Sequence, residues 1–238
     1  MSSSSDPPLL MRNHILRALP RQSYQLLFSN LQQVQLERDR ILYDLGEPIT
    51  SVFFITSGMV SLLATTENGS STQVAMVSEE GVVGAAVVLK TDKAPYQVMV
   101  QIPGRAMRVR ADVFVNEFGR DGPLRDILLR YIHCLISQIS RTAACNRFHT
   151  VEQRLSCWLL IGQDKVKSEV LTLTQERLAN MLGAKRTNVT KAAATLKRAG
   201  IIQYHHGRIR ILNRSALEQI SCECYRLVTE ELGCFLAA

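Results

Sequence analysis

The side chains with the clearest chemical use in this sequence are polar and basic, and they lie between residues 174 and 199. Thr174 can accept a hydrogen bond from an unpaired N–H at the start of a helix, and Gly183 permits the left-handed turn that follows a helix. The apolar positions of this segment are Leu178, Met181, Leu182, Val189, Ala193 and Leu196. Their spacing of three and four residues is typical of two buried helix faces, and the small Ala179 lets the helices cross closely. The pattern predicts a helix-turn-helix, whose second helix enters the major groove of DNA.

Burial of these apolar positions leaves a polar and basic surface at the start of the second helix. The N-terminal part of a recognition helix is the part that reaches base edges. A hairpin predicted at 201–212 carries His206 at its tip, with Arg208 beside it, and is expected to contact backbone phosphates as a wing. The residues that we predict to bind DNA are Thr174, Gln175, Lys185, Arg186, Thr187, Asn188, Thr190, Lys191, His206 and Arg208. An ordinary helical hairpin with a solvated surface is the alternative interpretation.

The distribution of charge supports a nucleic-acid partner. The net charge of the whole chain is +7. Residues 147–214 hold 13 Lys and Arg against 4 Asp and Glu, a net of +9, whereas residues 1–146 hold 14 against 13. A concentrated basic block favours binding to DNA because each neutralised phosphate releases counterions.

The elements before this basic block predict a domain rich in short strands. Residues 13–29 show helical spacing that is broken at Pro20. Between residues 31 and 110, β-branched and aromatic runs are separated by turn signals, among them Ser57-Gly58 and Pro103-Gly104. Many short strands with such punctuation are typical of a β-roll or a jelly roll.

A long apolar helix is predicted over residues 123–148. Its apolar stripe is wider than packing against one domain requires, so we expect the helix to pair with its mate in a parallel homodimer. The predicted interface residues are Leu128, Tyr131, Leu135 and Ile139. Thr150 with Gln153 matches a capping box, which predicts a hinge at about 146–150 and a new helix that ends near Gly162. A single amphipathic helix is expected over residues 215–236.

The composition excludes several other classes of protein. No apolar run reaches the roughly 18 residues that a membrane span needs, and the N-terminus does not have the pattern of a secretory signal, so a cytoplasmic protein is expected. A metal enzyme on a jelly-roll barrel needs His and acidic ligands on inward strands, and residues 15–132 contain no His and no Cys. No catalytic residues are predicted.

Six cysteines all lie at or after position 134, which does not match the dense disulfide framework of a small secreted protein. We interpret them as reduced thiols that serve as small core or interface residues, and no metal or cofactor site is predicted. A redox or haem sensor is the alternative. Its candidate residues are Cys145, Cys222, Cys224, His133 and His149. The adjacent His205 and His206 are not expected to bind a metal, because neighbouring residues on a turn rarely converge on one ion.

The sequence over roughly 13–212 resembles the family of the cyclic-AMP receptor protein and FNR. The second half carries the more specific likeness, in Thr174-Gln-Glu, Gly183, Arg186 and Lys191. The first half matches more loosely, through Gly46-Glu47, Ile55-Thr-Ser-Gly58 and Gly81-Val-Val-Gly84. The resemblance implies a homodimeric transcription regulator that binds an inverted-repeat operator, with RNA polymerase as a further partner and Arg186 as the base-reading arginine.

The resemblance also implies an α+β fold with three parts in a fixed order. They are an N-terminal cyclic-nucleotide-binding-like β-roll, a long dimerisation helix and a C-terminal winged helix-turn-helix. The predicted segments are a disordered tail at 1–12, the β-roll sensor domain at 13–122, the dimerisation helix and hinge at 123–149, the winged helix-turn-helix at 150–214 and a C-terminal helix at 215–238.

Two regions depart from the family pattern. In the recognition helix, Thr187 and Lys191 stand where a glutamate and a second arginine are common, which alters the expected operator. In the β-roll, Ala85 and Tyr96 replace the glutamate and the arginine that bind cyclic nucleotides. The residues expected to line an effector pocket are Gly81, Gly84, Ala85, Tyr96 and Gln97.

We therefore expect no response to cyclic AMP, because a buried phosphate would lack a guanidinium partner. The roll either holds a less charged effector or is filled by its own side chains. An iron–sulfur centre of the FNR type requires clustered cysteines near the N-terminus, and the first cysteine here is Cys134. A protein interaction module without DNA binding is the remaining alternative function.

Overall fold

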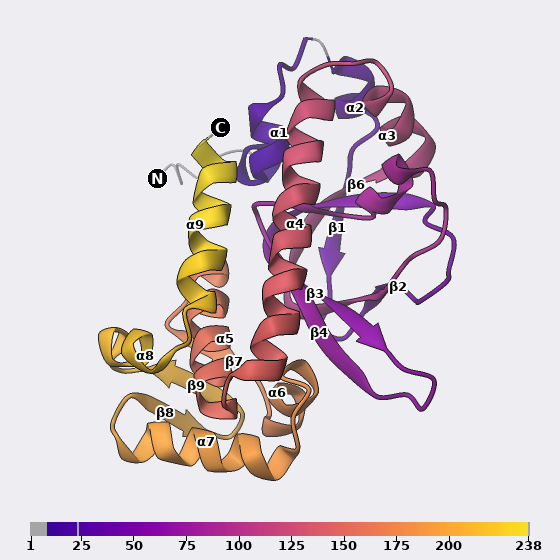
Figure 1. Cartoon of the computed structure of the whole chain (residues 1–238). Helices are drawn as coiled ribbons and strands as arrows, with labels where there is room; N and C mark the ends of the chain where they lie inside the picture. The colour runs from indigo at the N-terminus through magenta and orange to yellow at the C-terminus, as the bar shows by residue number, and fades with distance from the viewer. Residues whose placement is uncertain (1–8, 23, 238) are drawn as a thin grey trace. The chain divides into compact units, whose positions relative to one another are not determined.

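The computed structural model describes residues 9–22 and 24–237 (Figure 1). The chain divides into two compact units. The first unit consists of two segments, the residues up to Val60 and Val77–Ile132. The second unit consists of Ser61–Met76 and the residues from His133 onward. Among the described residues, no helix combines the length and the apolar character that crossing a bilayer requires.

The first unit begins with three short helices, η1 (Leu9–Arg12), α1 (His14–Ala18) and α2 (Gln25–Ser29). The break at Pro20 is therefore confirmed. Most of the expected disordered tail, residues 1–8, lies outside the described residues, while residues 9–12 form η1. Asn13 caps α1 and is fully buried, and its amide donates hydrogen bonds to the carbonyl oxygens of Ile55 (2.9 Å) and Gly81 (2.8 Å). These bonds fix the start of α1 to the sheet.

Six strands form the sheet that the alternating pattern predicted. They are β1 (Gln32–Leu36), β2 (Ile41–Tyr43), β3 (Ser51–Thr65), β4 (Ser71–Val77), β5 (Val82–Val83) and β6 (Gln97–Arg110). The order is β1-β6-β3-β4, with β2 paired to β6 and β5 paired to β3. The pairs β1–β6, β2–β6 and β3–β5 are antiparallel.

Two of the expected turns are wrong, because β3 runs through Ser57-Gly58 and β6 runs through Pro103-Gly104 without a break. The glycines serve close packing between these two strands. A Cβ on Gly58 would lie 2.5 Å from the carbonyl oxygen of Ile102, and one on Gly104 would overlap the carbonyl oxygen of Ser57. Gly58 also has a positive φ of 80°, which a residue with a side chain could adopt at this position only with strain. In a strand interior, glycine thus marks a close backbone approach.

Three helical segments follow β5 and β6: η2 (Ala85–Leu89), α3 (Ala111–Phe118) and α4 (Pro123–Phe148). The long helix is confirmed at both predicted ends. Its first half packs within the first unit, where Leu124 and Leu128 are fully buried and the Tyr131 hydroxyl donates a 2.8 Å hydrogen bond to the carbonyl oxygen of Val82.

The second unit contains the predicted helix-turn-helix and hairpin. Its elements are α5 (Val151–Val166), β7 (Val170–Thr172), α6 (Gln175–Met181), α7 (Arg186–Arg198), β8 (Ile202–His205) and β9 (Arg208–Ile211). The capping box of Thr150 and Gln153 is confirmed. The helix continues past Gly162, the expected end, and stops where Lys167 adopts a left-handed conformation (φ 53°). The three strands form a small sheet in the order β7-β9-β8.

The C-terminal segment forms two helices, α8 (Arg214–Ile220) and α9 (Cys224–Ala237), so the expectation of one continuous helix is wrong. The chain leaves the helical conformation at Ser221, which has extended backbone angles. Cys222 and Cys224 are both buried, with exposures of 3% and 5%. The break lets these two side chains turn into the protein.

Candidate nucleic-acid interface

The helix-turn-helix is built by the local signals that its sequence contains. The Thr174 hydroxyl oxygen caps α6 by accepting a hydrogen bond from the backbone N–H of Arg177 (3.3 Å). Gly183 has a φ of 53° in the turn, and Lys185 is the N-cap of α7. The apolar stripes are buried as expected, at Leu178, Ala179, Met181, Leu182, Val189, Ala193 and Leu196. Burial of these stripes fixes which face of α7 points to solvent.

The start of α7 presents the polar residues predicted from the sequence. Its exposed positions are Lys185, Arg186, Thr187, Asn188, Thr190 and Lys191. Within the described part of the chain, Lys185, Arg186 and Lys191 form no ion pair with a carboxylate. The first turn of α7 contains no acidic residue. The positive end of the helix dipole and these cations therefore both contribute to a positive electrostatic potential at the start of α7.

A hydrogen bond joins the two helices at this surface. The Thr190 hydroxyl donates to the side-chain oxygen of Gln175 (2.8 Å), which stands at the first position of α6. The same hydroxyl lies 2.9 Å from the carbonyl oxygen of Arg186. Both Gln175 and Thr190 belong to the predicted set, and their bond holds the beginning of α6 against α7.

The hairpin after α7 has the geometry of a two-residue turn. His206 (φ 47°) and Gly207 (φ 72°) are both left-handed, as a type I′ hairpin requires. The His206 and Arg208 side chains are exposed. Arg210 instead pairs with Glu169 at 3.0 Å, a partner from the segment before β7 that the sequence did not indicate. Arg208 is thus the arginine of the hairpin that is available to a phosphate.

A tyrosine that the sequence did not indicate lies beside one of the residues predicted to line an effector pocket. Gly84 has a φ of 90°, and a Cβ there would lie 2.8 Å from the Tyr43 hydroxyl oxygen. That hydroxyl donates a hydrogen bond to the carbonyl oxygen of Ser51. Burial, with a smaller contribution from Tyr96, raises the pKa of Tyr43 well above its ordinary value. Tyr43 is the last residue of a short strand that precedes a turn. The alternation of inward and outward side chains along this strand is the sequence signal that could have indicated its burial.

The other predicted pocket residues are divided between two places. Burial raises the pKa of Tyr96 to about 12, and Gln97 donates a 3.0 Å hydrogen bond to the carboxylate of Asp44. Ala85 is buried in η2. Gly81 packs beneath the ring of Tyr131 on α4, where any side chain would overlap the ring. Its role is therefore close packing rather than pocket lining.

The predicted dimer residues of α4 also divide into two groups. Leu128 and Tyr131 are buried within their own chain, with exposures of 0% and 3%. Leu135 and Ile139 are half-buried. Apart from Phe148 (75%) at its last position, the exposed large apolar residues of this helix are Leu129 (46%) and Ile136 (58%), which lie seven residues apart on one face. The sequence of a wide apolar stripe does not indicate which of its residues pack within their own chain and which remain exposed for a partner.

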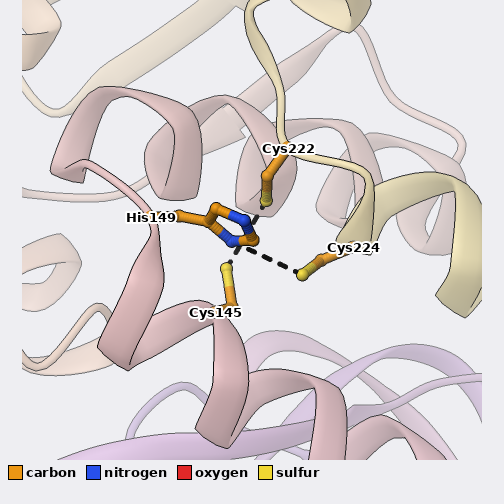
Figure 2. A group of neighbouring side chains, drawn as sticks. All are labelled: Cys145, His149, Cys222 and Cys224. Carbon is orange, nitrogen blue, oxygen red and sulfur yellow. Dashed lines mark hydrogen bonds between the residues drawn. The ribbon is translucent and has the colours of Figure 1, made fainter.

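Four of the five residues considered for a redox or haem sensor come together in the second unit. Cys145, His149, Cys222 and Cys224 place one ligand atom each within 4.8 Å of one another (Figure 2). The fifth candidate, His133, lies elsewhere and contacts Glu231 at 3.1 Å. The sequence signals were the one-turn spacing of Cys145 and His149 and the Cys-x-Cys pattern, and neither indicates that the two segments meet.

The comparisons with known proteins agree with this arrangement of domains. Residues 33–121 match the family model of the cyclic nucleotide-binding domain, and residues 153–220 match that of the Crp-like helix-turn-helix domain. A Global nitrogen regulator from Synechococcus elongatus is 24% identical over 199 residues, which cover 79% of this chain and 89% of the relative.

Solved structures share the fold at low sequence identity. FixK2 from Bradyrhizobium japonicum has a TM-score of 0.70 and 16% identity, and the match covers 81% of this chain and 98% of that protein. A transcriptional regulator of the CRP family from Thermus thermophilus has a TM-score of 0.67 and 17% identity, covering 79% and 96%.

A β-rich N-terminal domain, a long helix and a winged helix-turn-helix in this order define a class of DNA-binding transcription regulators. Within that class, the chain belongs to the Crp/FNR family. The family consists of regulators of transcription, which are not enzymes.

Proposed function

We propose that the protein acts as a homodimer that binds an inverted-repeat operator through the exposed start of α7. The observation that carries this proposal is the group of unpaired cations, Lys185, Arg186 and Lys191, on the solvent face of a helix whose opposite face is buried. Arg186 has the length and the planar donor geometry to bind guanine through two hydrogen bonds. Arg208 on the hairpin contacts phosphate, which positions the domain without reading sequence.

The homodimer is supported by the exposed apolar residues of α4. Leu129 and Ile136 lie on one face of a helix of 26 residues, and apolar side chains of this size are stabilised when a second copy covers them. Two copies related by a twofold axis carry two recognition helices, which an inverted repeat matches when its half-sites are about 34 Å apart. RNA polymerase is the further partner that we assign to the bound dimer. We propose no catalytic activity for the chain.

Selection of binding sites from a random duplex library by the full-length protein tests this function. We expect enrichment of an inverted repeat whose half-sites are centred about one helical turn apart. An Ile136→Glu variant should sediment as a monomer and lose operator affinity, whereas Ile41→Glu, an exposed apolar residue on β2, should remain dimeric. Enrichment of no sequence, or a dimer that persists in Ile136→Glu, would contradict the proposal.

We also propose that the β-roll does not respond to cyclic nucleotides. The Tyr43 hydroxyl lies beside Gly84, and no arginine lies between residues 41 and 104 to pair with a phosphate. Calorimetry with cyclic AMP and cyclic GMP at millimolar concentration should give no binding heat. Binding of either nucleotide in the micromolar range, with a matching rise in operator affinity, would overturn this part of the proposal.

A further inference from the structure

We propose that Cys145, His149, Cys222 and Cys224 bind a single Zn²⁺ ion in a tetrahedral Cys₃His site. This site is independent of the DNA-binding function proposed above. The four side chains come from two segments of the chain that are far apart in sequence. Cys145 in the first segment and Cys222 in the second are 77 residues apart. Figure 2 shows the four side chains turned toward one another from these two segments.

The distances between the ligand atoms fit one small ion. The sulfurs of Cys145 and Cys222 are 3.5 Å apart, and the Cys224 sulfur is 3.6 Å from Nδ1 of His149. Zinc–sulfur bonds of about 2.3 Å in a tetrahedron place neighbouring sulfurs about 3.8 Å apart. A cluster of two or four irons distributes its ligands over several metal atoms, which requires a wider group than one confined to 4.8 Å. The compact arrangement and the sulfur-rich donor set therefore favour Zn²⁺.

A carboxylate orients the histidine for metal binding. Nε2 of His149 lies 3.3 Å from a carboxylate oxygen of Glu223, which stands between the two ligands Cys222 and Cys224. When Nε2–H donates to this carboxylate, the lone pair of the imidazole is on Nδ1, the nitrogen that faces Cys224. Carboxylate–histidine–metal arrangements fix the tautomer in this way and raise the basicity of the ligand.

A buried arginine beside the site supplies the matching charge. Arg154 on α5 is only 8% exposed, and its Nη2 donates to the side-chain oxygen of Asn146 (2.7 Å) while Nε has no hydrogen-bond partner. Arg154 lines the same cavity as the ligands Cys145 and Cys224. Among the described residues, no carboxylate pairs with this guanidinium. Three thiolates around one Zn²⁺ carry a net charge of −1, which compensates the buried cation.

The sulfur atoms already interact with one another in the absence of an ion. The Cys222 sulfur lies within hydrogen-bonding distance of the Cys145 sulfur, and metals bind cysteine in its thiolate form. Cys157 is buried on α5 and lies outside the group of four ligands. A disulfide between Cys145 and Cys222 would use two of these residues and leave His149, Glu223 and Cys224 without a role, so we favour the ion.

The position of the site indicates what the ion does for the fold. Cys145 lies in the last turn of α4, and His149 lies in the hinge before α5. Cys222 lies between α8 and α9, and Cys224 is the first residue of α9. The winged helix-turn-helix lies between these ligand segments in the sequence. The ion therefore closes a long loop that contains the DNA-binding domain, and its binding energy adds to the stability of the second unit.

Metal analysis of the full-length protein tests the proposal. The protein is purified without a metal-binding tag, reconstituted with Zn²⁺ under reducing conditions and freed of excess ion by gel filtration. Mass spectrometry of the elements should find about one zinc per chain, and Co²⁺ in its place should give the absorption of a tetrahedral thiolate complex. Competition with a coloured chelator gives the affinity of the unaltered protein without any variant.

Matched variants assign the ligands. His149→Gln and Cys224→Ser should lose most of the bound zinc, whereas His133→Gln and Cys134→Ser, which alter residues outside the group, should retain it. Circular dichroism checks that each variant is folded. The proposal is wrong if the folded, reduced protein binds no zinc, if the two ligand variants keep it, if iron and inorganic sulfide are bound instead, or if a Cys145–Cys222 disulfide forms in preference to metal binding.

Discussion

The two units of this protein use their polar side chains in different ways. In the first unit, the Tyr43 hydroxyl is bonded within the chain beside Gly84, and Gln97 is bonded to a neighbouring carboxylate. In the second unit, Arg186 extends to solvent without a carboxylate partner, and the atoms around Cys222 converge on one point. Polar groups that already have partners gain little from a ligand, whereas unpaired cations and converging thiols gain a great deal. The contrast supports the proposals of DNA binding and metal binding, both of which lie in the second unit.

Loss of the zinc site should have the largest effect and would test the contrast most severely. Cys222→Ser removes a central ligand, and if free zinc exceeds its dissociation constant about 1000-fold, the unit loses about 4 kcal/mol of stability. For a chain of this size the midpoint of thermal unfolding should fall by roughly 10 °C. Calorimetry measures this shift, with the exposed Cys234→Ser as the control. Equal unfolding temperatures for the two variants would break the contrast.

Removal of the guanidinium at the start of α7 should have the next largest effect. Arg186→Ala should cost about 1–3 kcal/mol on the selected operator and relax the preference at one base pair, because the contact reads a base edge. Arg208→Ala should weaken all duplexes to a similar degree and reduce the salt dependence, because it contacts phosphate. Fluorescence anisotropy with specific and random duplexes separates the two. An equal loss on both duplexes for Arg186→Ala would exclude its base-reading role.

A smaller effect is expected from the carboxylate behind His149. Glu223→Gln keeps the shape of the side chain but weakens the orientation of the imidazole, so zinc affinity should fall by about tenfold. Glu230→Gln is a suitable control, because Glu230 pairs with Arg226 on the exposed surface of α9. Chelator competition gives both affinities. If the two variants have the same affinity, Glu223 does not orient the ligand.

The smallest effect tests the first unit. Tyr43→Phe removes the hydrogen bond to the Ser51 carbonyl and should lower the free energy of unfolding by about 1 kcal/mol. Tyr96→Phe removes a hydroxyl for which the described structure has no hydrogen-bond partner and should cost less than about 0.5 kcal/mol. Denaturant titration of both variants gives the difference. A stabilised Tyr43→Phe would indicate that this hydroxyl is held for a ligand instead of for the fold.

Local signals in the sequence predicted the elements that depend on near neighbours. The capping box at Thr150 and Gln153, the left-handed Gly183 and the alternating burial of α7 involve residues within a few positions of one another. The helix-turn-helix could be predicted for this reason, and the comparisons confirm it. The exposed start of α7 follows from the same periodicity, because burial of one face leaves the other in solvent.

The features that the sequence predicted wrongly, or did not predict, depend on packing between segments that are distant in the chain. Gly58 and Gly104 have the appearance of turn residues, but they allow β3 and β6 to approach closely. Leu128 and Tyr131 belong to an apolar stripe that could pack against a partner chain or against its own domain. Both residues are buried within the first unit. The break between α8 and α9 follows the burial of Cys222, which no helical pattern indicates.

The sequence by itself determined the class of fold, the basic block and the surface that we propose to face DNA, because charge, capping and periodicity are properties of adjacent residues. Only the tertiary structure brought Cys145 and His149 to Cys222 and Cys224, and only it placed the Tyr43 hydroxyl beside Gly84. These arrangements join segments far apart in the chain. Their formation depends on the packing of every element between them, which local pattern does not specify.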